Sequence, residues 1–139
     1  MSVLLDTCVL SEAQRPKPDI RVIVAIERLN SSEIYFSVIT IGEIVRGITL
    51  LDPGHRRSGL EAWLREIETD HRDQVLPVDS EVARLWGHAS AHLARQGVVI
   101  ADADILIAAT ALRYELPVMT RNVRHFRHLD VQVIDPWSE

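Results

Sequence analysis

The sequence predicts an α/β protein in which helices cover both faces of a central, mainly parallel sheet. Short apolar runs rich in β-branched residues alternate along the chain with longer segments whose apolar residues recur at helical spacing. The 139 residues are 47% hydrophobic and 25% charged, which excludes bulk disorder and is enough for one self-sufficient core. We therefore expect a single domain over residues 1–139.

The first half of the chain contains two expected strands, each followed by a helix. Val3–Leu5 is wholly apolar, as in a strand that is buried on both faces. Apolar residues at helical spacing cover residues 19–29, after a proline-containing break. Ile34–Ile39 is rich in β-branched and aromatic residues and predicts the second strand, and a helix is expected over residues 40–51.

The second half of the chain continues the alternation. In order, we expect a helix around residues 60–67, an edge strand at 75–78, a long helix that begins at an Asp79 or Ser80 cap and ends near Gly97, a buried helix at 105–112, and short strands at 117–120 and 131–134. Right-handed crossovers place the carboxyl ends of parallel strands along one edge of the sheet, where ligands of such sheets bind.

Composition excludes several classes of protein. No apolar run approaches the roughly 18 residues of a membrane-spanning helix, and the start of the chain lacks the basic region of a secretory signal. Cys8 is the lone cysteine and cannot form an internal disulfide, which fits the cytoplasm. The net charge of −5 excludes a molecule that is basic overall, although the segment 121–128 carries three arginines and no acid.

Acidic and amide side chains follow the expected strands. Asp6 comes directly after the first strand, Glu43 lies one helical turn beyond the second, Asp102 and Asp104 precede the buried helix, and Asn122 follows the strand at 117–120. Carboxylates that meet at one edge repel each other by about 1–4 kcal/mol per pair at ~4 Å, which a bound cation would offset. Oxygen ligands suit Mg²⁺ or Mn²⁺ better than zinc, so the pattern predicts phosphodiester hydrolysis by a metal-activated water.

Each of these acids also has a structural explanation. Asp6 could cap the turn that follows its strand, and Glu43 could complete a capping box with Thr40. Asp102 or Asp104 could be the N-cap of the buried helix. The coincidence of all these positions at one edge of the sheet is what favours the metal site.

Five segments together resemble the PIN-domain ribonucleases, and in particular the VapC-type toxins of the FitB-like branch. They are LLDTCVLSE (4–12), SVITIGEIVRGI (37–48), LPVD (76–79), DILIAATA (104–111) and TRNVRHF (120–126). The resemblance implies a three-layer α/β/α fold with a central, mainly parallel sheet, and Mg²⁺- or Mn²⁺-dependent endonuclease activity on RNA. It also implies a homodimer that a cognate VapB/FitA-like DNA-binding antitoxin neutralises in a larger assembly.

The resemblance extends to individual residues. Asp6, Glu43 and Asp104 match the acids that hold metal in this family, and Asp102 lies near Asp104 in the chain. Thr120 matches a hydroxyl expected to orient Asp6.

Three positions depart from the family pattern. Asn122 stands where many members have a fourth acid, and its amide would hold a second metal more weakly. Cys8 stands where asparagine is common, and His125 where an aspartate often precedes the phenylalanine. These departures are the best support for one alternative, a catalytically impaired PIN-fold binding protein.

Arginines near these motifs are candidates for contacts with substrate or antitoxin. Arg46 follows Glu43 by one helical turn, and Arg121 and Arg124 lie in the acid-free segment. Plain surface charge explains them equally well. A further alternative keeps the same acids but has a different substrate, as in a metal-dependent DNA nuclease or phosphatase.

Overall fold

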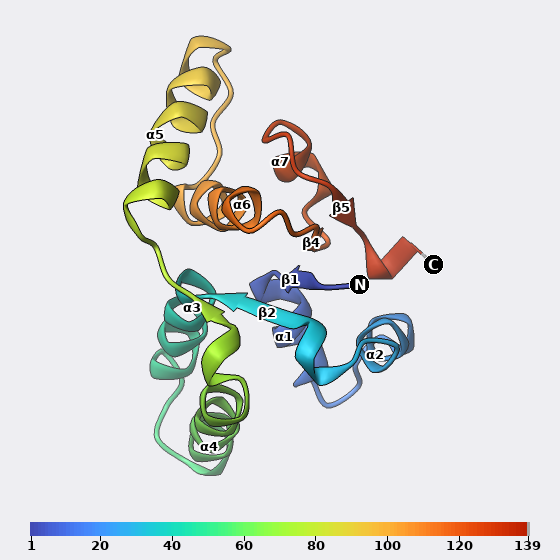
Figure 1. Cartoon of the computed structure of the whole chain (residues 1–139). Coiled ribbons are helices and arrows are strands. Elements are labelled where there is room, and N and C mark those ends of the chain that lie inside the picture. Colours follow the sequence, from blue (N-terminus) through green and yellow to red (C-terminus); the bar gives the residue numbers. More distant parts are fainter. Residues whose placement is uncertain (139) are drawn as a thin grey trace.

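The computed structural model describes residues 1–138, and Figure 1 shows a central sheet with helices above and below it. The sheet has five strands among these residues, in the spatial order β3-β2-β1-β4-β5, and every pair is parallel. The strands are β1 (Val3–Leu5), β2 (Ile34–Ser37), β3 (Val75–Leu76), β4 (Val118–Met119) and β5 (Val133–Ile134). The parallel sheet and the edge position of β3 confirm the predictions.

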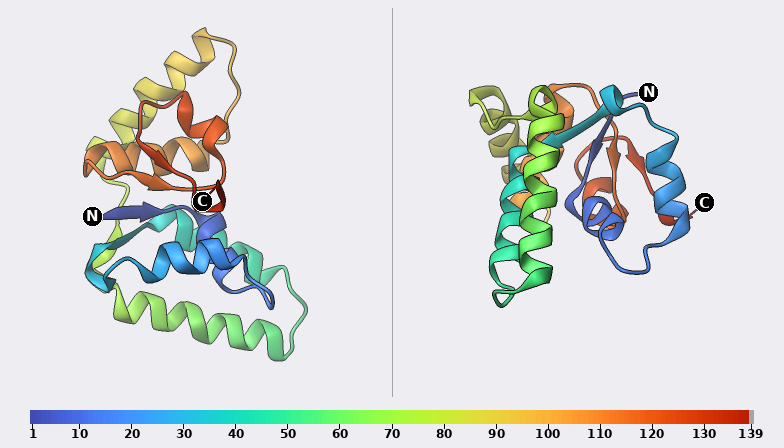
Figure 2. Two further views of the ribbon diagram at one scale, coloured as in Figure 1. Left: turned by 90° about the vertical axis from the view of Figure 1, so that its right-hand side faces the viewer. Right: turned by 90° about the horizontal axis from the view of Figure 1, so that it is seen from below.

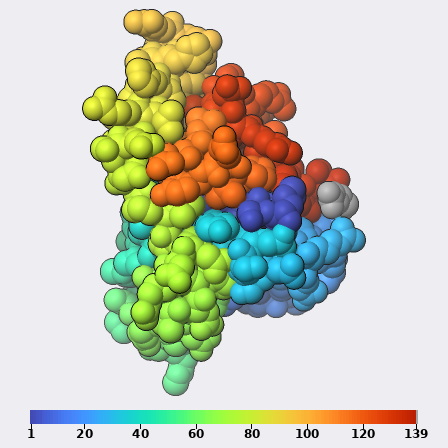
Figure 3. All heavy atoms as spheres, viewed as in Figure 1, coloured from blue at the N-terminus to red at the C-terminus, as the bar shows by residue number. Residues whose placement is uncertain are grey.

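Helices form the two outer layers. They are α1 (Thr7–Ala13), α2 (Ile20–Glu27), α3 (Val38–Thr49), α4 (His55–Asp70), α5 (Ser80–Arg95), α6 (Asp102–Arg113) and α7 (Val123–Arg127), with short 3₁₀ turns η1 (Ser31–Glu33), η2 (Arg72–Gln74) and η3 (Pro136–Ser138). Helices α1 to α4 lie on one side of the sheet and α5 to α7 on the other (Figures 1 and 2). In the space-filling view α5, in yellow, extends beyond the rest of the molecule (Figure 3). Within residues 1–138, no helix is long and apolar enough to cross a membrane.

The central strand explains the two layers. Val3 and Leu5 pack in the core beneath α1 to α4, while Leu4 packs in the core beneath α5 to α7. Successive side chains of a strand point to opposite faces of the sheet, so an all-apolar run is what two cores require.

The boundary between β2 and α3 differs from the prediction. The strand ends at Ser37 rather than Ile39, because the Ser37 hydroxyl accepts a hydrogen bond from the Ile39 N–H at 3.0 Å and caps α3. Thr40 therefore lies inside the helix, fully buried, and the expected capping box of Thr40 with Glu43 is wrong. Glu43 is left free to contact another element.

Two short helices were not predicted, α1 and α7. The expected short strands at 75–78, 117–120 and 131–134 exist but are two residues long. The expected cap at Asp79 is confirmed, since its carboxylate accepts from the Val82 N–H at 2.9 Å.

Candidate active site

Asp6 lies at the carboxyl edge of the sheet because β1 ends at Leu5. The register pairs Leu5 with Met119, so Asp6 and Thr120 follow their strands side by side. Asp6 is 2% exposed, and its Oδ2 accepts a hydrogen bond from the Thr120 hydroxyl at 2.7 Å. Its Oδ1 accepts from the Thr7 N–H at 2.8 Å and caps α1. Asp6 therefore does cap the segment that follows its strand, as its structural explanation predicted.

The pKa of Asp6 is raised, which its role as a helix cap does not explain. Burial raises the pKa of the Asp6 carboxyl, and the negative charge of Asp104 acts in the same direction. The hydrogen bonds from Thr120 and Thr7 oppose this rise but do not cancel it. Two acids from distant parts of the chain therefore interact at this edge, and a cation would relieve both the burial and the repulsion.

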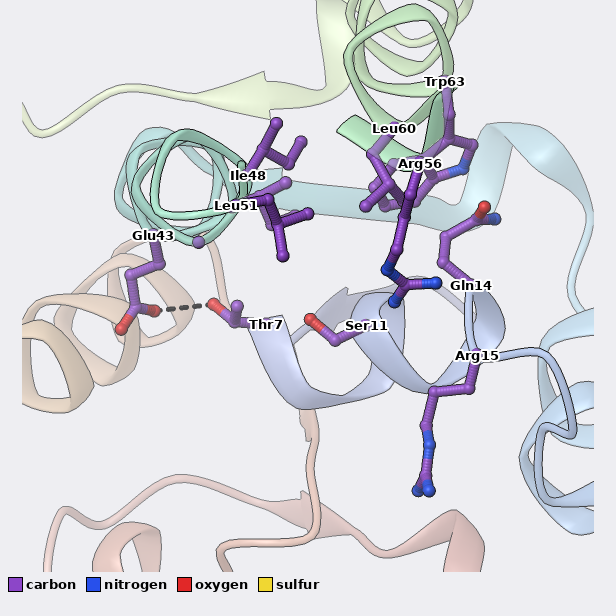
Figure 4. Close-up of a pocket in the computed structure, with 12 residues that line it drawn as sticks. Thr7, Ser11, Gln14, Arg15, Glu43, Ile48, Leu51, Arg56, Leu60 and Trp63 are labelled. Carbon is purple, nitrogen blue, oxygen red and sulfur yellow. Dashed lines mark hydrogen bonds between the residues drawn. The ribbon is translucent and has the colours of Figure 1, made fainter. Parts of the chain in front are cut away.

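Glu43 reaches the same edge from α3. Its Oε1 accepts a hydrogen bond at 2.6 Å from the hydroxyl of Thr7, the residue next to Asp6 (Figure 4). The Thr7 hydroxyl also lies 3.3 Å from that of Thr40, which ties α1 to α3. Glu43 itself is exposed, unlike Asp6.

Asp104 lies in the first turn of α6 and faces α7. Its Oδ2 is 2.7 Å from Nδ1 of His125, and its side chain is 14% exposed. Asp102 begins the helix and is exposed. The N-cap is Ala101, which makes no side-chain cap, so the alternative in which Asp102 or Asp104 caps this helix is wrong.

The remaining candidates surround these acids. Asn122 precedes α7 and is exposed, and its backbone N–H donates to the Thr120 hydroxyl at 2.9 Å. Arg46 and Arg124 are exposed on α3 and α7. The guanidinium of Arg121 lies over a tryptophan ring of η3, at 5.2 Å from its centroid.

The acids do not form a ready set of metal ligands. Within residues 1–138, no three His, Cys, Asp or Glu side chains are grouped closely enough to hold an ion. Glu43 and Asp104 each have a protein partner instead, Thr7 and His125. The donor chemistry nevertheless fits a hard divalent cation, because all three acids offer carboxylate oxygens and Asp6 is a buried acid beside a like charge.

Three contacts were missed by sequence reasoning. Thr7 bonds Glu43 and His125 bonds Asp104. Both contacts could have been expected only if the helices α1 and α7, which carry Thr7 and His125, had been predicted. Cys8 places its sulfur 3.6 Å from Asp6 Oδ2 and from the Thr120 hydroxyl. Burial, reinforced by the charge of Asp6, raises the pKa of the Cys8 thiol to about 11, so the thiol stays protonated near neutral pH.

A pocket of about 230 Å³ opens beside Glu43 between α1, α3 and α4. Thr7 and Ser11 border it from α1, and Trp63 and Arg56 from α4. Figure 4 shows the Arg56 guanidinium near Ser11, across the space between the two helices. Arg56 was not among the predicted site residues.

The comparisons with known proteins define the class. The PIN domain family matches residues 3–132, and the chain belongs to this family. Toxin FitB of Neisseria gonorrhoeae is 36% identical over 99% of both chains, and VapC ribonuclease Y4jK of Sinorhizobium fredii is 32% identical over 98% of both. Within the PIN family the chain therefore belongs to the VapC family, and it is similar to Toxin FitB.

Solved structures agree with this assignment. The structure of FitAcB from Neisseria gonorrhoeae superposes with a TM-score of 0.93 at 36% identity, covering 99% of both chains. A structure of FitAB bound to a DNA fragment gives 0.91 at 35% identity, covering 97% of this chain and 95% of that one. The PIN-like α/β fold expected from the sequence is confirmed.

Proposed function

We propose that this protein is a divalent-metal-dependent endoribonuclease and the toxin of a toxin–antitoxin pair. The observation that carries the proposal is Asp6, a buried carboxylate at the carboxyl edge of the sheet whose pKa is raised by burial and by the charge of another acid, Asp104. The ribonuclease name of a relative that matches nearly the whole chain supports RNA as the substrate.

Three acids would hold the ion in this proposal. Asp6 and Asp104 would hold Mg²⁺ or Mn²⁺ directly, and Glu43 would either hold it too or accept a proton from water. An ion held by these acids would offset the charge of the phosphate and lower the pKa of water. Thr120 fixes the Asp6 carboxylate through its 2.7 Å hydrogen bond, and Thr7 does the same for Glu43 at 2.6 Å. The neutral amide of Asn122 adds no charge, which favours a single ion.

The partners follow from the family. We propose that the protein forms a homodimer in the cytoplasm and that a VapB/FitA-like DNA-binding antitoxin neutralises it in a larger assembly. A similar structure, FitAB, has been solved on DNA, which supports a partner of this kind. Co-expression with any small reading frame found next to its gene, followed by co-purification and mass measurement of the complex, tests the proposal.

The nuclease is tested with Asp6→Asn, which removes the charge and keeps the shape and the helix cap. We expect the purified wild-type protein to cut total RNA in the presence of Mg²⁺ and a chelator to stop this cleavage. RNA cleavage by the Asp6→Asn variant should fall to background. Asp52→Asn, at an exposed loop position, is the matched control and should cut like the wild type. Parallel assays on DNA and on a generic phosphoester test the alternative substrates. Full activity of a folded Asp6→Asn protein would refute the site.

A further inference from the structure

A second pocket lies at the C-terminal end of α1, on the side of the η3 turn. It has a volume of about 280 Å³ and is lined by Glu12, Arg15, Lys17, Asp19, Arg121 and Trp137. Three of these six residues are cationic, in a chain whose net charge is −5.

This pocket is close to the proposed active site. Arg121 directly follows Thr120, and its backbone N–H lies 3.5 Å from the sulfur of Cys8, which in turn contacts Asp6. Arg15 borders both this pocket and the one beside Glu43. In Figure 4 the Arg15 side chain extends away from Arg56 and the apolar wall of that first pocket. The two pockets thus share Arg15 as a wall residue, next to the C-terminal end of α1.

The two carboxylates of the pocket already have partners. Glu12 is 6% exposed, and its two oxygens accept from the Asp19 N–H at 2.9 Å and from Arg15 at 3.2 Å. Asp19 lies 2.7 Å from the guanidinium of Arg21, which lowers the pKa of the Asp19 carboxyl to about 2. Both acids thus have hydrogen-bond partners other than Lys17 and Arg121, and the charge of Arg121 adds only a minor contribution to the lowered pKa of Asp19.

Those two cations, Lys17 and Arg121, make no ion pair with another residue in the part of the chain that the structure describes, residues 1–138. Arg121 is held over the ring of Trp137, which is 7% exposed and fixed in the core. A guanidinium held by its face keeps its in-plane N–H donors for a phosphate, and little side-chain entropy remains to be lost. Lys17 stands between Pro16 and Pro18, whose rings restrict the backbone that carries it.

We propose that this pocket binds a phosphate of the RNA backbone beside the cleaved bond, through Lys17 and Arg121. The inference rests on the proposed nuclease function and assigns it a substrate subsite. A fork of guanidinium donors and a mobile ammonium suit the spread charge of a phosphodiester. The path around the end of α1 would lead the strand from this subsite toward the acids.

The test measures binding separately from cleavage. Fluorescence anisotropy with a labelled single-stranded RNA oligonucleotide, in a chelator, gives the affinity at several salt concentrations. Each phosphate contact of a single strand contributes about 0.7 to the slope of log affinity against log salt. Because both residues contact the same phosphate, we expect Lys17→Gln/Arg121→Gln to lower that slope by about 0.7. Its affinity should therefore fall about 2.6-fold less than the wild type's between ~50 and ~200 mM salt.

A double variant of α5, Arg84→Gln/Arg95→Gln, removes the same charge far from the pocket (Figure 1). It should keep the wild-type slope. Equal slopes for the two folded double variants would overturn the subsite, and so would a wild-type protein that does not bind RNA. The subsite would also be overturned if Lys17→Gln/Arg121→Gln were defective only in binding an acidic protein partner. If the slopes differ as expected but the wild type never cuts RNA with Mg²⁺, the subsite stands and the nuclease proposal fails.

Discussion

Two aspartates begin helices in the same way but lie in opposite electrostatic surroundings. Asp6 caps α1 and Asp19 caps α2, each through an oxygen that accepts a backbone N–H, at 2.8 and 2.9 Å. Hydrogen bonds from Arg21 lower the pKa of Asp19 to about 2. Burial raises the pKa of Asp6, and the charge that acts on it is that of another acid, Asp104.

The difference separates a structural carboxylate from one with a further role. Helix capping requires neither burial nor a second acid, as Asp19 demonstrates at the surface. A buried carboxylate without a cation costs stability unless something compensates for it. Asp6 is therefore better explained by a positive charge that binds there than by the cap alone.

The largest expected contrast between the two aspartates is in metal binding. A ligand present at about 100 times its Kd stabilises the folded state by about 2.7 kcal/mol, so Mg²⁺ or Mn²⁺ should raise the Tm of the wild type. Asp6→Asn should abolish this shift and Asp19→Asn should preserve it, because only Asp6 interacts with a second acid. Thermal unfolding with and without metal measures both.

Two outcomes of that experiment would break the comparison. An Asp6→Asn protein with the full metal-dependent shift would mean that the ion binds elsewhere. A wild-type protein with no shift at saturating Mn²⁺ would leave Asp6 as a cap that happens to be buried.

The next effect concerns Thr120, the donor that distinguishes Asp6 from Asp19. Thr120→Val keeps the shape and removes a fully buried hydroxyl that donates to a charged acceptor at 2.7 Å. We expect it to lower the free energy of unfolding by about 1–3 kcal/mol and to weaken metal binding by about 10- to 100-fold. Thr7→Val, whose hydroxyl donates to the exposed Glu43, is the control and should cost less in denaturant titrations. Equal losses in the two variants would contradict this ranking.

A smaller effect is expected at His125, which bonds Asp104 from a half-exposed position. His125→Ala should change the unfolding free energy by no more than about 0.5 kcal/mol, because the side chain is near the surface. It should still weaken metal binding, by up to about tenfold, since Asp104 loses the group that orients it. His125→Asn, whose amide can donate from a similar place, should recover most of the affinity in calorimetric titrations. A normal affinity in His125→Ala would show that the contact is incidental.

Much of this site could be predicted from the sequence because strand ends mark one edge of a parallel sheet. Asp6 follows from the apolar run that precedes it, whereas Thr120 was expected only from the resemblance to PIN-domain ribonucleases. The partners Thr7 and His125 could not be predicted in this way, since they depend on α1 and α7, which are seven and five residues long. Helices so short draw their stability from packing rather than from a recognisable periodicity.

The strand β2 ends at Ser37 rather than at the predicted Ile39, and this error has a related cause. Val38 and Ile39 extend the β-branched run of β2, so propensity favours a longer strand, and only the hydrogen bond from the Ile39 N–H to the Ser37 hydroxyl ends it. That contact shifts the start of α3 and frees Glu43 from the capping role that its spacing suggested. The β-branched residues favour a longer strand, but the helix cap at Ser37 decides where the strand ends.

The smallest expected effect is the acid dependence contributed by Asp19. Its pKa is about 2 when folded and near 3.8 when unfolded, so its contribution to stability is complete above pH ~5 and is lost as pH falls through 2. Asp19→Asn keeps the cap but cannot titrate, so its stability should vary less than the wild type's in that range when measured by denaturant titration. Because Arg21 is exposed and Asp19 is partly exposed, the difference should shrink in about 1 M salt. A wild-type acid profile unchanged by Asp19→Asn would mean that the ion pair with Arg21 is not maintained in solution, and the contrast with Asp6 would then depend on burial alone.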